Sequence, residues 1–440
     1  MQAAPQRILS LFDAVCIAAG IIIGAGIYQI TPAVARGAGT VAQLMSLWII
    51  GGLLSLCGAL SYAELAAAYP NSTGGDFVYL TKAYGRPAGF LFGWSQLVIV
   101  RPGDIAVMAF AFATYGRQIW EPAAVDPQIS QRLYAAGAVV VLTLMNMLGV
   151  RQGKWTQNLL TAVKAVGLIG IAAAGLAVNR PVEPARPLEP IPAGLALIFV
   201  LFTYGGWNEV AYVAAEVKNP GKNIVRALAV GMAAVMILYL LVNGAFVYGL
   251  TFGGLAASEA PASDMLACLL PSGGRQLISA LICVSALGAV NGLIFTGARI
   301  SYAMGSEYRL FRLLGNWNQH TGGPVWALAV QGSIAVCLIV VFGGYMDAIL
   351  YTAAAVYAFY MATAFSVIVL RYRQPQVPRP YQVSFYPLPP LIFCIVCAFL
   401  IYNSVSYAWA FRPASLLVLA TAAGLGLAVY IAVERYNYNC

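Results

Sequence analysis

The chain has 440 residues, of which 61% are hydrophobic and only 9% are charged. Soluble domains carry about 25% charged residues, so this composition, with a mean hydropathy of +0.80, excludes a soluble protein. The net charge of +9 predicts membrane topology rather than nucleic-acid binding, because the basic residues gather in the loops on one side of the predicted spans.

Apolar runs recur along the whole chain and are separated by short loops. About 20 apolar residues are needed for a helix to cross the ~30 Å of hydrocarbon in a bilayer. We therefore predict an all-α membrane protein with twelve transmembrane helices. In chain order the runs are 9–34, 41–68, 87–116, 132–149, 154–178, 192–214, 224–250, 274–304, 325–343, 346–371, 387–409 and 413–434.

The lysines and arginines predict the orientation of these spans. With the N-terminus in the cytoplasm, fifteen of the 24 basic residues lie inside and seven outside, while Arg101 and Lys164 remain in the membrane. This asymmetry follows the positive-inside rule and predicts that both termini are cytoplasmic. The seven outer residues are Arg36, Arg117, Arg132, Arg180, Arg186, Arg275 and Arg412. The cytoplasmic segment 74–87 is predicted to form an amphipathic helix at the interface.

The first run contains the sequence GIIIGAGIYQITP, which places Gly20, Gly24 and Gly26 at a depth where water is absent. Glycine costs about 1 kcal/mol relative to alanine inside a helix, and an unsatisfied backbone group in hydrocarbon costs several kcal/mol. Close packing of helices through small residues would by itself explain such a pattern. A ligand that binds the freed backbone groups is the other explanation.

Two further spans carry ionisable residues. Arg101 and Asp104 are three residues apart on the third run, beside Pro102, so we expect a local ion pair that stabilises a bend. Lys164 lies ten residues past Lys154 on the fifth run, about 15 Å along a helix, which is too deep to reach the interface. A buried ammonium needs partners, and a lysine that releases its proton would allow proton-coupled uptake.

The sixth run, LIFVLFTYGGWNEVAYVAAEVKNPGKN, is interrupted at Gly205 and Gly206. It opens a second block of five helices, 192–371, just as the first run opens the block 9–178. Five is an odd number, so the second block enters the membrane in the opposite orientation. Broken helices at corresponding positions of inverted halves indicate a transporter site at the membrane midplane. The predicted domains are a transport core, 1–373, and two additional helices, 387–434.

The two interruptions leave backbone groups free to bind a zwitterion, and an α-amino acid matches this arrangement. Glycine lets such a ligand approach the backbone without a Cβ in the way. The N–H groups expected to bind a carboxylate are those of Ala25, Gly26 and Ile27. The carbonyl groups expected to bind an ammonium are those of Ile22, Phe202, Thr203 and Gly205.

Asn208 and Glu209 follow the second interruption. They are about 100° apart around a helix, so both cannot point into one pocket. We expect Glu209 to pair with a polar side chain of another helix rather than to contact substrate. If Glu209 faces the site instead, a cationic substrate would fit.

The sequence lacks the patterns that several other classes of protein require. His320 is the only histidine and lies in a predicted loop, which excludes a histidine-based metal site and a Ser/His/Asp triad. A channel needs a continuous polar lining or charged rings, and a membrane enzyme needs clustered catalytic groups. We therefore predict a protein that is not an enzyme and that holds no metal or cofactor.

Six segments together resemble the L-type amino acid transporters of the amino acid–polyamine–organocation superfamily. In order between about residues 8 and 410, they are GIIIGAGIYQITP, LVIVRPGDIAVMAFAFATY, TAVKAVGLIGI, LFTYGGWNEVAYVAAEVKNPGKNI, GAVNGLIFTGARISYAMGSE and VLRYRQPQVPRPYQV. The resemblance implies a five-plus-five inverted repeat with helices 1 and 6 unwound at mid-membrane, alternating access, and sodium-independent exchange of amino acids. Proton-coupled symport is the alternative mechanism.

The resemblance also implies roles for single residues. It assigns the amides of the first interruption to the substrate carboxylate and the carbonyls of both interruptions to its ammonium. It implies that the Phe202 ring gates the site, that Asn208 tunes the side-chain subsite, and that Tyr357 closes the far end of the pocket. Family members that take basic substrates often carry an acidic residue in the Gly205–Gly206 doublet, so we predict neutral L-amino acids here.

For Lys164 the resemblance implies a fixed cation that bridges the first and eighth helices, where sodium-coupled relatives hold a sodium ion. Its expected partners are the carbonyl of Gly20 and a group near Thr296. The sequence departs from the family pattern at Gly297, where a hydroxyl residue is common. It departs again at Asp104, and we assign Arg101 and Asp104 to packing or gating.

Animal members of this family attach to a single-span heavy chain through a cysteine in the external loop after the third helix. The corresponding loop here, GRQIWEPAAVDPQIS, has no cysteine. We therefore expect a stand-alone subunit in a prokaryotic inner membrane, without a covalent heavy-chain partner. Its expected partners are an amino acid substrate and membrane lipid, and no nucleic acid.

Overall fold

The computed structural model describes residues 5–121, 125–178, 190–270, 273–341, 345–411 and 413–438. For 345–353, and for a few positions near the C-terminal end, it describes the backbone alone. Three predicted outer residues, Arg180, Arg186 and Arg412, lie outside the described residues. Within the described ranges every regular element is a helix, so the predicted all-helical class is confirmed.

Nine segments of the described chain are long and apolar enough to span a membrane. They are Leu11–Gln29 (α1, Leu11–Ile22, and α2, Gly26–Gln29), Val41–Ala68 (α4), Arg86–Ile119 (α6, Arg86–Ser95, a π-helical turn and α7, Arg101–Ile119), Val150–Ala177 (α9), Pro220–Ala257 (α12), Gly274–Glu307 (α14), Ala354–Arg373 (in α16, Tyr345–Arg373), Leu388–Ala410 (in α17, Leu388–Phe411) and Leu416–Arg435 (in α18, Pro413–Tyr438).

At the other three predicted spans the helices are shorter or less apolar. They are α8 (Pro127–Met147), α10 (Ala193–Thr203) with α11 (Glu209–Tyr212), and α15 (Val325–Val341). The remaining helices connect the longer ones: α3 (Thr31–Ala38), α5 (Asp76–Tyr84) and α13 (Pro261–Leu269), with 3₁₀ turns at Ala214–Glu216 and Arg309–Phe311. The helix predicted within 74–87 is present as α5, whereas α13 was not predicted.

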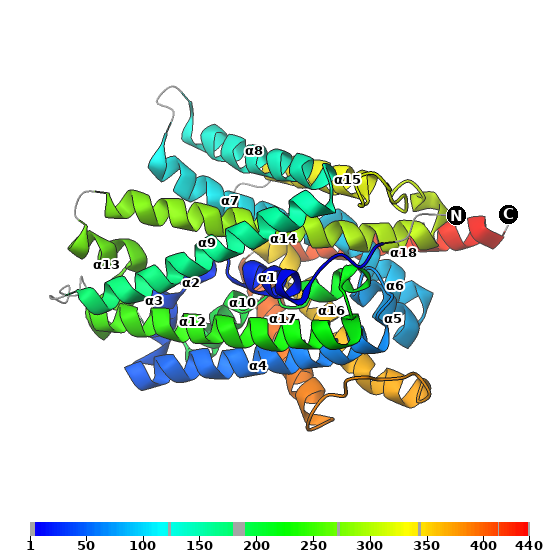
Figure 1. Cartoon of the computed structure of the whole chain (residues 1–440), viewed down its shortest axis with the longest axis horizontal. Coiled ribbons are helices and arrows are strands. Elements are labelled where there is room, and N and C mark those ends of the chain that lie inside the picture. The colour runs from blue at the N-terminus through cyan, green and yellow to red at the C-terminus, as the bar shows by residue number, and fades with distance from the viewer. Residues whose placement is uncertain are drawn as a thin grey trace.

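The centre of the bundle is built around α1, which α9, α12 and α14 surround (Figure 1). In the span Leu11–Gln29, 83% of the residues in the most apolar window are buried, against 11% in the span Leu416–Arg435. The chain that leads into α1 and the end of α18 lie at the same end of the bundle, on the right in Figure 1. The first helix is therefore a core element, and the last lies on the periphery.

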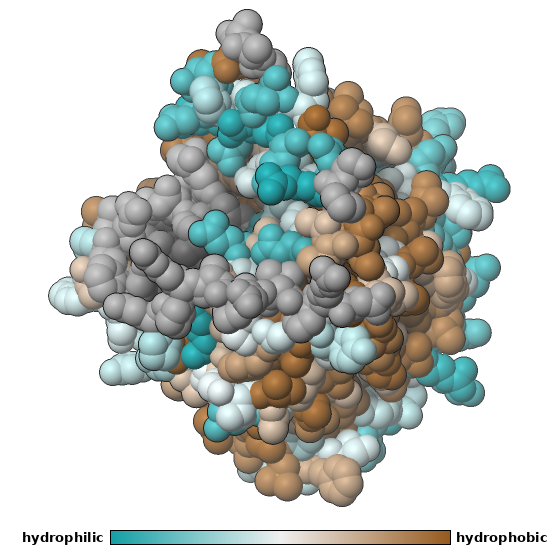
Figure 2. Space-filling view, turned by 90° about the vertical axis from the view of Figure 1, so that its left-hand side faces the viewer, coloured by the Kyte–Doolittle hydropathy of each residue, from teal (hydrophilic) through white to brown (hydrophobic). Residues whose placement is uncertain are grey.

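The outer surface of the bundle is apolar along its flanks. On α9 the exposed large side chains are Trp155, Leu159, Val163, Val166, Ile169 and Leu176. Soluble monomers rarely expose so large a contiguous apolar face, and lipid covers such a face in a membrane protein. Figure 2 views the bundle from the end that carries α13; hydrophilic residues gather in the upper part of this view, and hydrophobic residues cover much of its lower and right-hand part.

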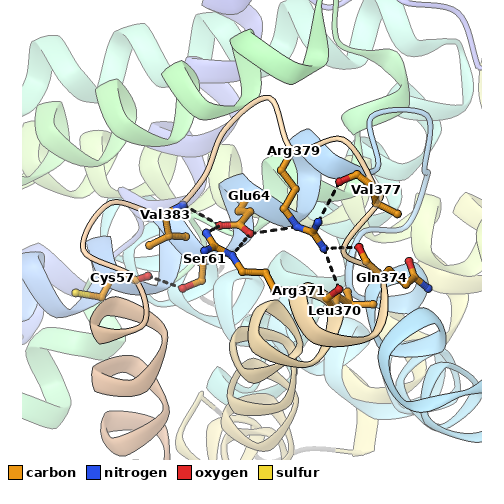
Figure 3. A network of polar contacts seen from close by, with 9 residues as sticks. All are labelled: Cys57, Ser61, Glu64, Leu370, Arg371, Gln374, Val377, Arg379 and Val383. Carbon is orange, nitrogen blue, oxygen red and sulfur yellow. Dashed lines mark hydrogen bonds and ion pairs between the residues drawn. The ribbon is translucent and has the colours of Figure 1, made fainter.

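A network around Glu64 ties α4 to α16 and to the segment that follows α16 (Figure 3). The Glu64 carboxylate accepts hydrogen bonds from Arg371 at 2.7 and 2.6 Å and from the amide of Val383 at 2.8 Å. Arg379 adds an ion pair at 3.5 Å, and its Nη2 donates to the carbonyl oxygens of Leu370 and Gln374. The carboxylate is only 1% exposed, so the two guanidinium groups supply the compensation that a buried charge requires.

Candidate functional site

The first helix is interrupted where the sequence places its glycines. Helix α1 ends at Ile22 and α2 begins at Gly26, and the residues between them are not helical. The amide of Gly24 donates to the carbonyl oxygen of Ile22 at 2.8 Å. Because α2 begins at Gly26, the amides of Gly26 and Ile27 have no acceptor inside that helix. Donors are therefore available on the α2 side of the interruption.

The sixth predicted span is interrupted as well. Helix α10 ends at Thr203, α11 begins at Glu209, and turns connect them. Gly206 has φ +100°, and a Cβ there would lie 2.8 Å from the Ile21 side chain and 3.3 Å from the Ile21 backbone. A Cβ on Gly26 would lie 3.1 Å from Thr203 Oγ1. The absence of side chains at these two glycines lets the interruptions approach each other closely.

A cavity of about 150 Å³ lies at this meeting point. Helices α4, α7, α14, α16 and α17 complete its walls, mostly with apolar side chains. Of the predicted site residues, the cavity is lined by Ile22, Gly26, Phe202, Thr203, Gly205, Tyr357, Glu209 and Asp104. Ala25 and Ile27 are fully buried and are not among the residues that line the cavity, so only their backbone groups remain candidates for substrate contact.

Tyr239 of α12 joins the two interruptions. Its hydroxyl lies 3.0 Å from the carbonyl oxygen of Ile22 and 3.3 Å from that of Thr203, and it donates to them. We predicted from the sequence that these two carbonyls bind the substrate ammonium. In the structure both already accept a hydrogen bond from the Tyr239 hydroxyl. Sequence reasoning missed Tyr239, because a tyrosine in an apolar helix is usually a packing residue whose hydroxyl finds a local partner.

Asn208 does not line the cavity, which corrects the prediction that it tunes the side-chain subsite directly. Its side-chain amide donates to the Tyr212 hydroxyl at 2.8 Å and accepts from the Tyr360 hydroxyl at 2.9 Å. The Tyr212 hydroxyl in turn donates to Asp76 of α5 at 2.8 Å. Tyr360 is the member of this network that lines the cavity, and it was not predicted.

Asp76 is fully buried at the start of α5, outside the spans. Burial raises the pKa of its carboxyl to about 7, against the hydrogen bond from Tyr212 that favours the charged form. The chain of hydrogen bonds from Asp76 to Tyr360 therefore connects a titratable group in a short connecting helix to the wall of the cavity.

Lys164 points at the first interruption from α9. Its ammonium donates to the carbonyl oxygens of Gly20 at 2.5 Å, Ile23 at 2.7 Å and Ser285 at 3.1 Å. The expected contact with Gly20 is present. The expected contact near Thr296 is wrong, because Ser285 stands eleven residues earlier on α14, about 16 Å along that helix.

Helix α14 also places the Ser285 hydroxyl in this region. It donates to the carbonyl oxygens of Ile23 and Gly24 at 3.2 and 3.0 Å. Together with Lys164, it satisfies the carbonyls that the end of α1 leaves free. A lone serine in the eighth apolar run was the signal that could have identified it, since a buried hydroxyl needs a partner.

Thr296 instead belongs to the site of Glu209 and Arg101. Arg101 Nη1 lies 2.9 Å from Glu209 Oε1, and the Thr296 hydroxyl donates to the other oxygen of Glu209. The predicted pairing of Glu209 with polar side chains of other helices is confirmed. The predicted Arg101–Asp104 pair is wrong, because Arg101 turns toward α11 while Asp104 faces the cavity.

Comparison with known proteins agrees with this arrangement. The family model described as amino acid permease matches residues 9–418. The chain is 29% identical to the b(0,+)-type amino acid transporter 1 of Mus musculus over 447 residues, which cover 99% of this chain and 89% of that protein. It is 32% identical to the large neutral amino acids transporter small subunit 2 of Mus musculus and of Homo sapiens over 418 residues, covering 91% of this chain and 76% of each relative.

These matches extend over almost the whole chain, including both interrupted helices. They confirm the resemblance that the six sequence segments indicate. The chain belongs to the amino acid permease family.

Proposed function

We propose that the protein carries neutral L-amino acids across the membrane by sodium-independent exchange, through alternating access. The observation that carries this proposal is the cavity of about 150 Å³ between the two interrupted helices. It places donor amides of one interruption near carbonyls of both, and backbone groups of opposite polarity suit the two charged ends of an amino acid. The names of the relatives, which are amino acid transporters, support the same substrate class.

The proposed architecture is a twelve-helix, five-plus-five inverted repeat. Residues 1–373 form its transport core, with halves 9–178 and 192–371, and 387–434 form two additional helices. The two interruptions, each in the first helix of its half, support this division. We place the protein in a cell inner membrane with both termini cytoplasmic, as a subunit without a covalent heavy-chain partner.

In the proposed complex the substrate carboxylate binds the amides of Ala25, Gly26 and Ile27. The substrate ammonium binds the carbonyls of Ile22 and Thr203, where it replaces or shares the hydrogen bonds of the Tyr239 hydroxyl. This pose satisfies both ends of the zwitterion with backbone groups, which carry no net charge.

The proposed side-chain subsite lies among apolar residues. Phe202 and Tyr357 line it together with Phe393 and Leu293. An apolar lining favours neutral side chains, because burying apolar surface contributes about 25 cal/mol per Å². Phe202 gates the subsite, and Tyr357 closes its far end.

Transport by purified protein in liposomes tests the proposal. Labelled L-leucine should enter only when the liposomes contain an unlabelled neutral amino acid, and sodium should make no difference. Uptake into empty liposomes under an imposed pH gradient would instead establish proton-coupled symport. That alternative rests on the buried ammonium of Lys164. Uptake that requires neither internal substrate nor a gradient would contradict both mechanisms.

A further inference from the structure

One carboxylate in the cavity has no part in the proposed binding of the amino acid backbone. Asp104 lies on α7, one helical turn before Met108, and both side chains are partly exposed and line the cavity. The neighbouring residues Gly103 and Ile105 are buried. The face of α7 that Asp104 occupies is thus the face that the substrate would meet.

The second carboxylate of the cavity, Glu209, is already compensated. It forms an ion pair with Arg101 at 2.9 Å and accepts a hydrogen bond from Thr296. Both Arg101 and Glu209 are at most 3% exposed. The contact to Glu209 is made through Nη1 of Arg101, whose Nε has no hydrogen-bond partner among the described residues, and no ion pair between Arg101 and Asp104 is found there.

In the described part of the chain, Asp104 therefore has no hydrogen-bond or ion-pair partner of its own. Among the described residues, no hydrogen bond or ion pair is found for its carboxylate, which interacts only through space with Arg101, Glu209, Tyr357 and Tyr360. The cluster holds one guanidinium and two carboxylates, which leaves one negative charge in excess. The buried ammonium of Lys164, at the first interruption, is occupied by three carbonyl oxygens.

A carboxylate among apolar side chains is unfavourable unless it binds a proton or a cation. The cavity that Asp104 lines is mostly apolar, with Val107, Met108, Leu293 and Phe393 in its walls, and its lining also includes Tyr357 and Tyr360, which carry hydroxyl groups. The cavity therefore lacks positive charge at the place where a substrate side chain would lie. A side chain that ends in an ammonium or a guanidinium would supply it.

We propose that Asp104 is a specificity-determining residue that lets the cavity bind amino acids with cationic side chains, in addition to neutral ones. This inference rests on the proposed transport function and extends its substrate range. The backbone of the substrate binds at the two interruptions as before, and its cationic end pairs with the Asp104 carboxylate.

Competition for exchange of labelled L-leucine in liposomes tests this proposal. L-Lysine and L-norleucine are the matched competitors, because norleucine has the same unbranched chain with a hydrogen in place of the ammonium. In the unaltered protein both should compete. Asp104→Asn should weaken competition by lysine at least about 30-fold, since losing one partner of a buried charge pair costs 2–5 kcal/mol. Competition by norleucine should change little.

Two further variants complete the experiment. Asp104→Glu keeps the charge and should retain competition by lysine. Glu259→Gln removes an exposed carboxylate from the connection between α12 and α13, and it should leave both competitors unchanged. Size-exclusion profiles and leucine exchange show whether each variant is folded.

Two results would overturn the proposal. One is a failure of lysine to compete in the unaltered protein while norleucine does. The other is an equal loss of competition by lysine and norleucine in Asp104→Asn, or none. Either result leaves leucine exchange intact, whereas absence of leucine exchange in the unaltered protein would refute the proposed function itself.

Discussion

Glu216 and Arg299 form a bidentate ion pair with contacts of 2.7 and 3.0 Å, and each side chain is only 1% exposed. Removing one partner of such a pair leaves an uncompensated buried charge, which costs about 3–5 kcal/mol. We therefore predict that Glu216→Gln clearly lowers the thermal unfolding midpoint of the purified protein in detergent.

The matched control is Glu121→Gln. Its partner Arg117 lies 2.5 Å away, but the two side chains are 37% and 24% exposed, and exposed pairs contribute about 0–1 kcal/mol. The thermal unfolding midpoint of Glu121→Gln should hardly change. Equal shifts for the two variants would contradict the assigned role of the buried pair.

The residue scale also shows where sequence reasoning reached its limit. The helical angle between Asn208 and Glu209 correctly predicted that both cannot face one pocket. This angle could not tell which of the two residues faces the pocket. The residues before Glu209 form turns, so the direction of each side chain cannot be counted along a continuous helix. The structure places Glu209 at the cavity and Asn208 in the network with Tyr212 and Tyr360.

At the scale of elements, Lys164 connects α9 to the end of α1 and to α14 through three carbonyl oxygens. Alternating access requires the interrupted helix to move relative to its neighbours. We predict that Lys164→Ala lowers the rate of leucine exchange more than it weakens leucine binding, measured by transport and by equilibrium binding on the same preparation.

Lys154→Ala is the control on the same helix. Lys154 is partly exposed and pairs with Asp13 at 3.2 Å, away from the interruption. Its exchange rate should fall less than that of Lys164→Ala. Exchange that is unaltered in Lys164→Ala would remove the proposed role of this lysine.

The connecting helix α5 makes stability depend on pH through Asp76. Burial raises the pKa of this carboxyl from its ordinary value of 3.8 to about 7, so the folded state holds a proton that the unfolded state releases. The stabilisation is present at low pH and is lost as the pH rises through about 7.

We therefore predict that the thermal midpoint of the unaltered protein falls between pH 5.5 and pH 8 by more than that of Asp76→Asn. The amide cannot titrate, and every other group is common to both proteins. Parallel pH profiles would show that Asp76 is ionised throughout the range.

Long apolar runs made the elements predictable, because a period and a length are local properties of the sequence. The 28-residue helix α4 coincides with its predicted run of 41–68. Two other features were not predicted. Helix α13 has only nine residues, too few for a distinct pattern, and α12 extends to Ala257 past a non-helical residue at Thr251.

At the scale of the whole molecule, the composition together with the length of the apolar runs was enough to predict a helical membrane protein. The partners of Lys164 and of Arg101 were not predictable, since they depend on which faces of distant helices meet. Ser285 lies 121 residues from Lys164 along the chain, and Glu209 lies 108 residues from Arg101. Hydrogen-bond partners at such separations are decided by packing and not by local pattern.

The distribution of the basic residues predicts how the whole bundle is oriented in the membrane, with both termini in the cytoplasm. A small epitope tag fused to either end should resist protease added outside intact cells and be digested after the membrane is permeabilised. The positive-inside asymmetry is the physical reason. Digestion of either tag in intact cells would reverse the proposed topology for that terminus.

The central claim is that backbone groups of the two interruptions bind the charged ends of an amino acid. The most direct measurement is an experimental structure determined with saturating L-leucine. The account predicts density in the cavity, with the leucine carboxylate at the amides of residues 25–27 and its ammonium at the carbonyls of Ile22 and Thr203. Density for leucine only at another place, such as the hollow lined by Phe112, Tyr134 and Leu160, would contradict it.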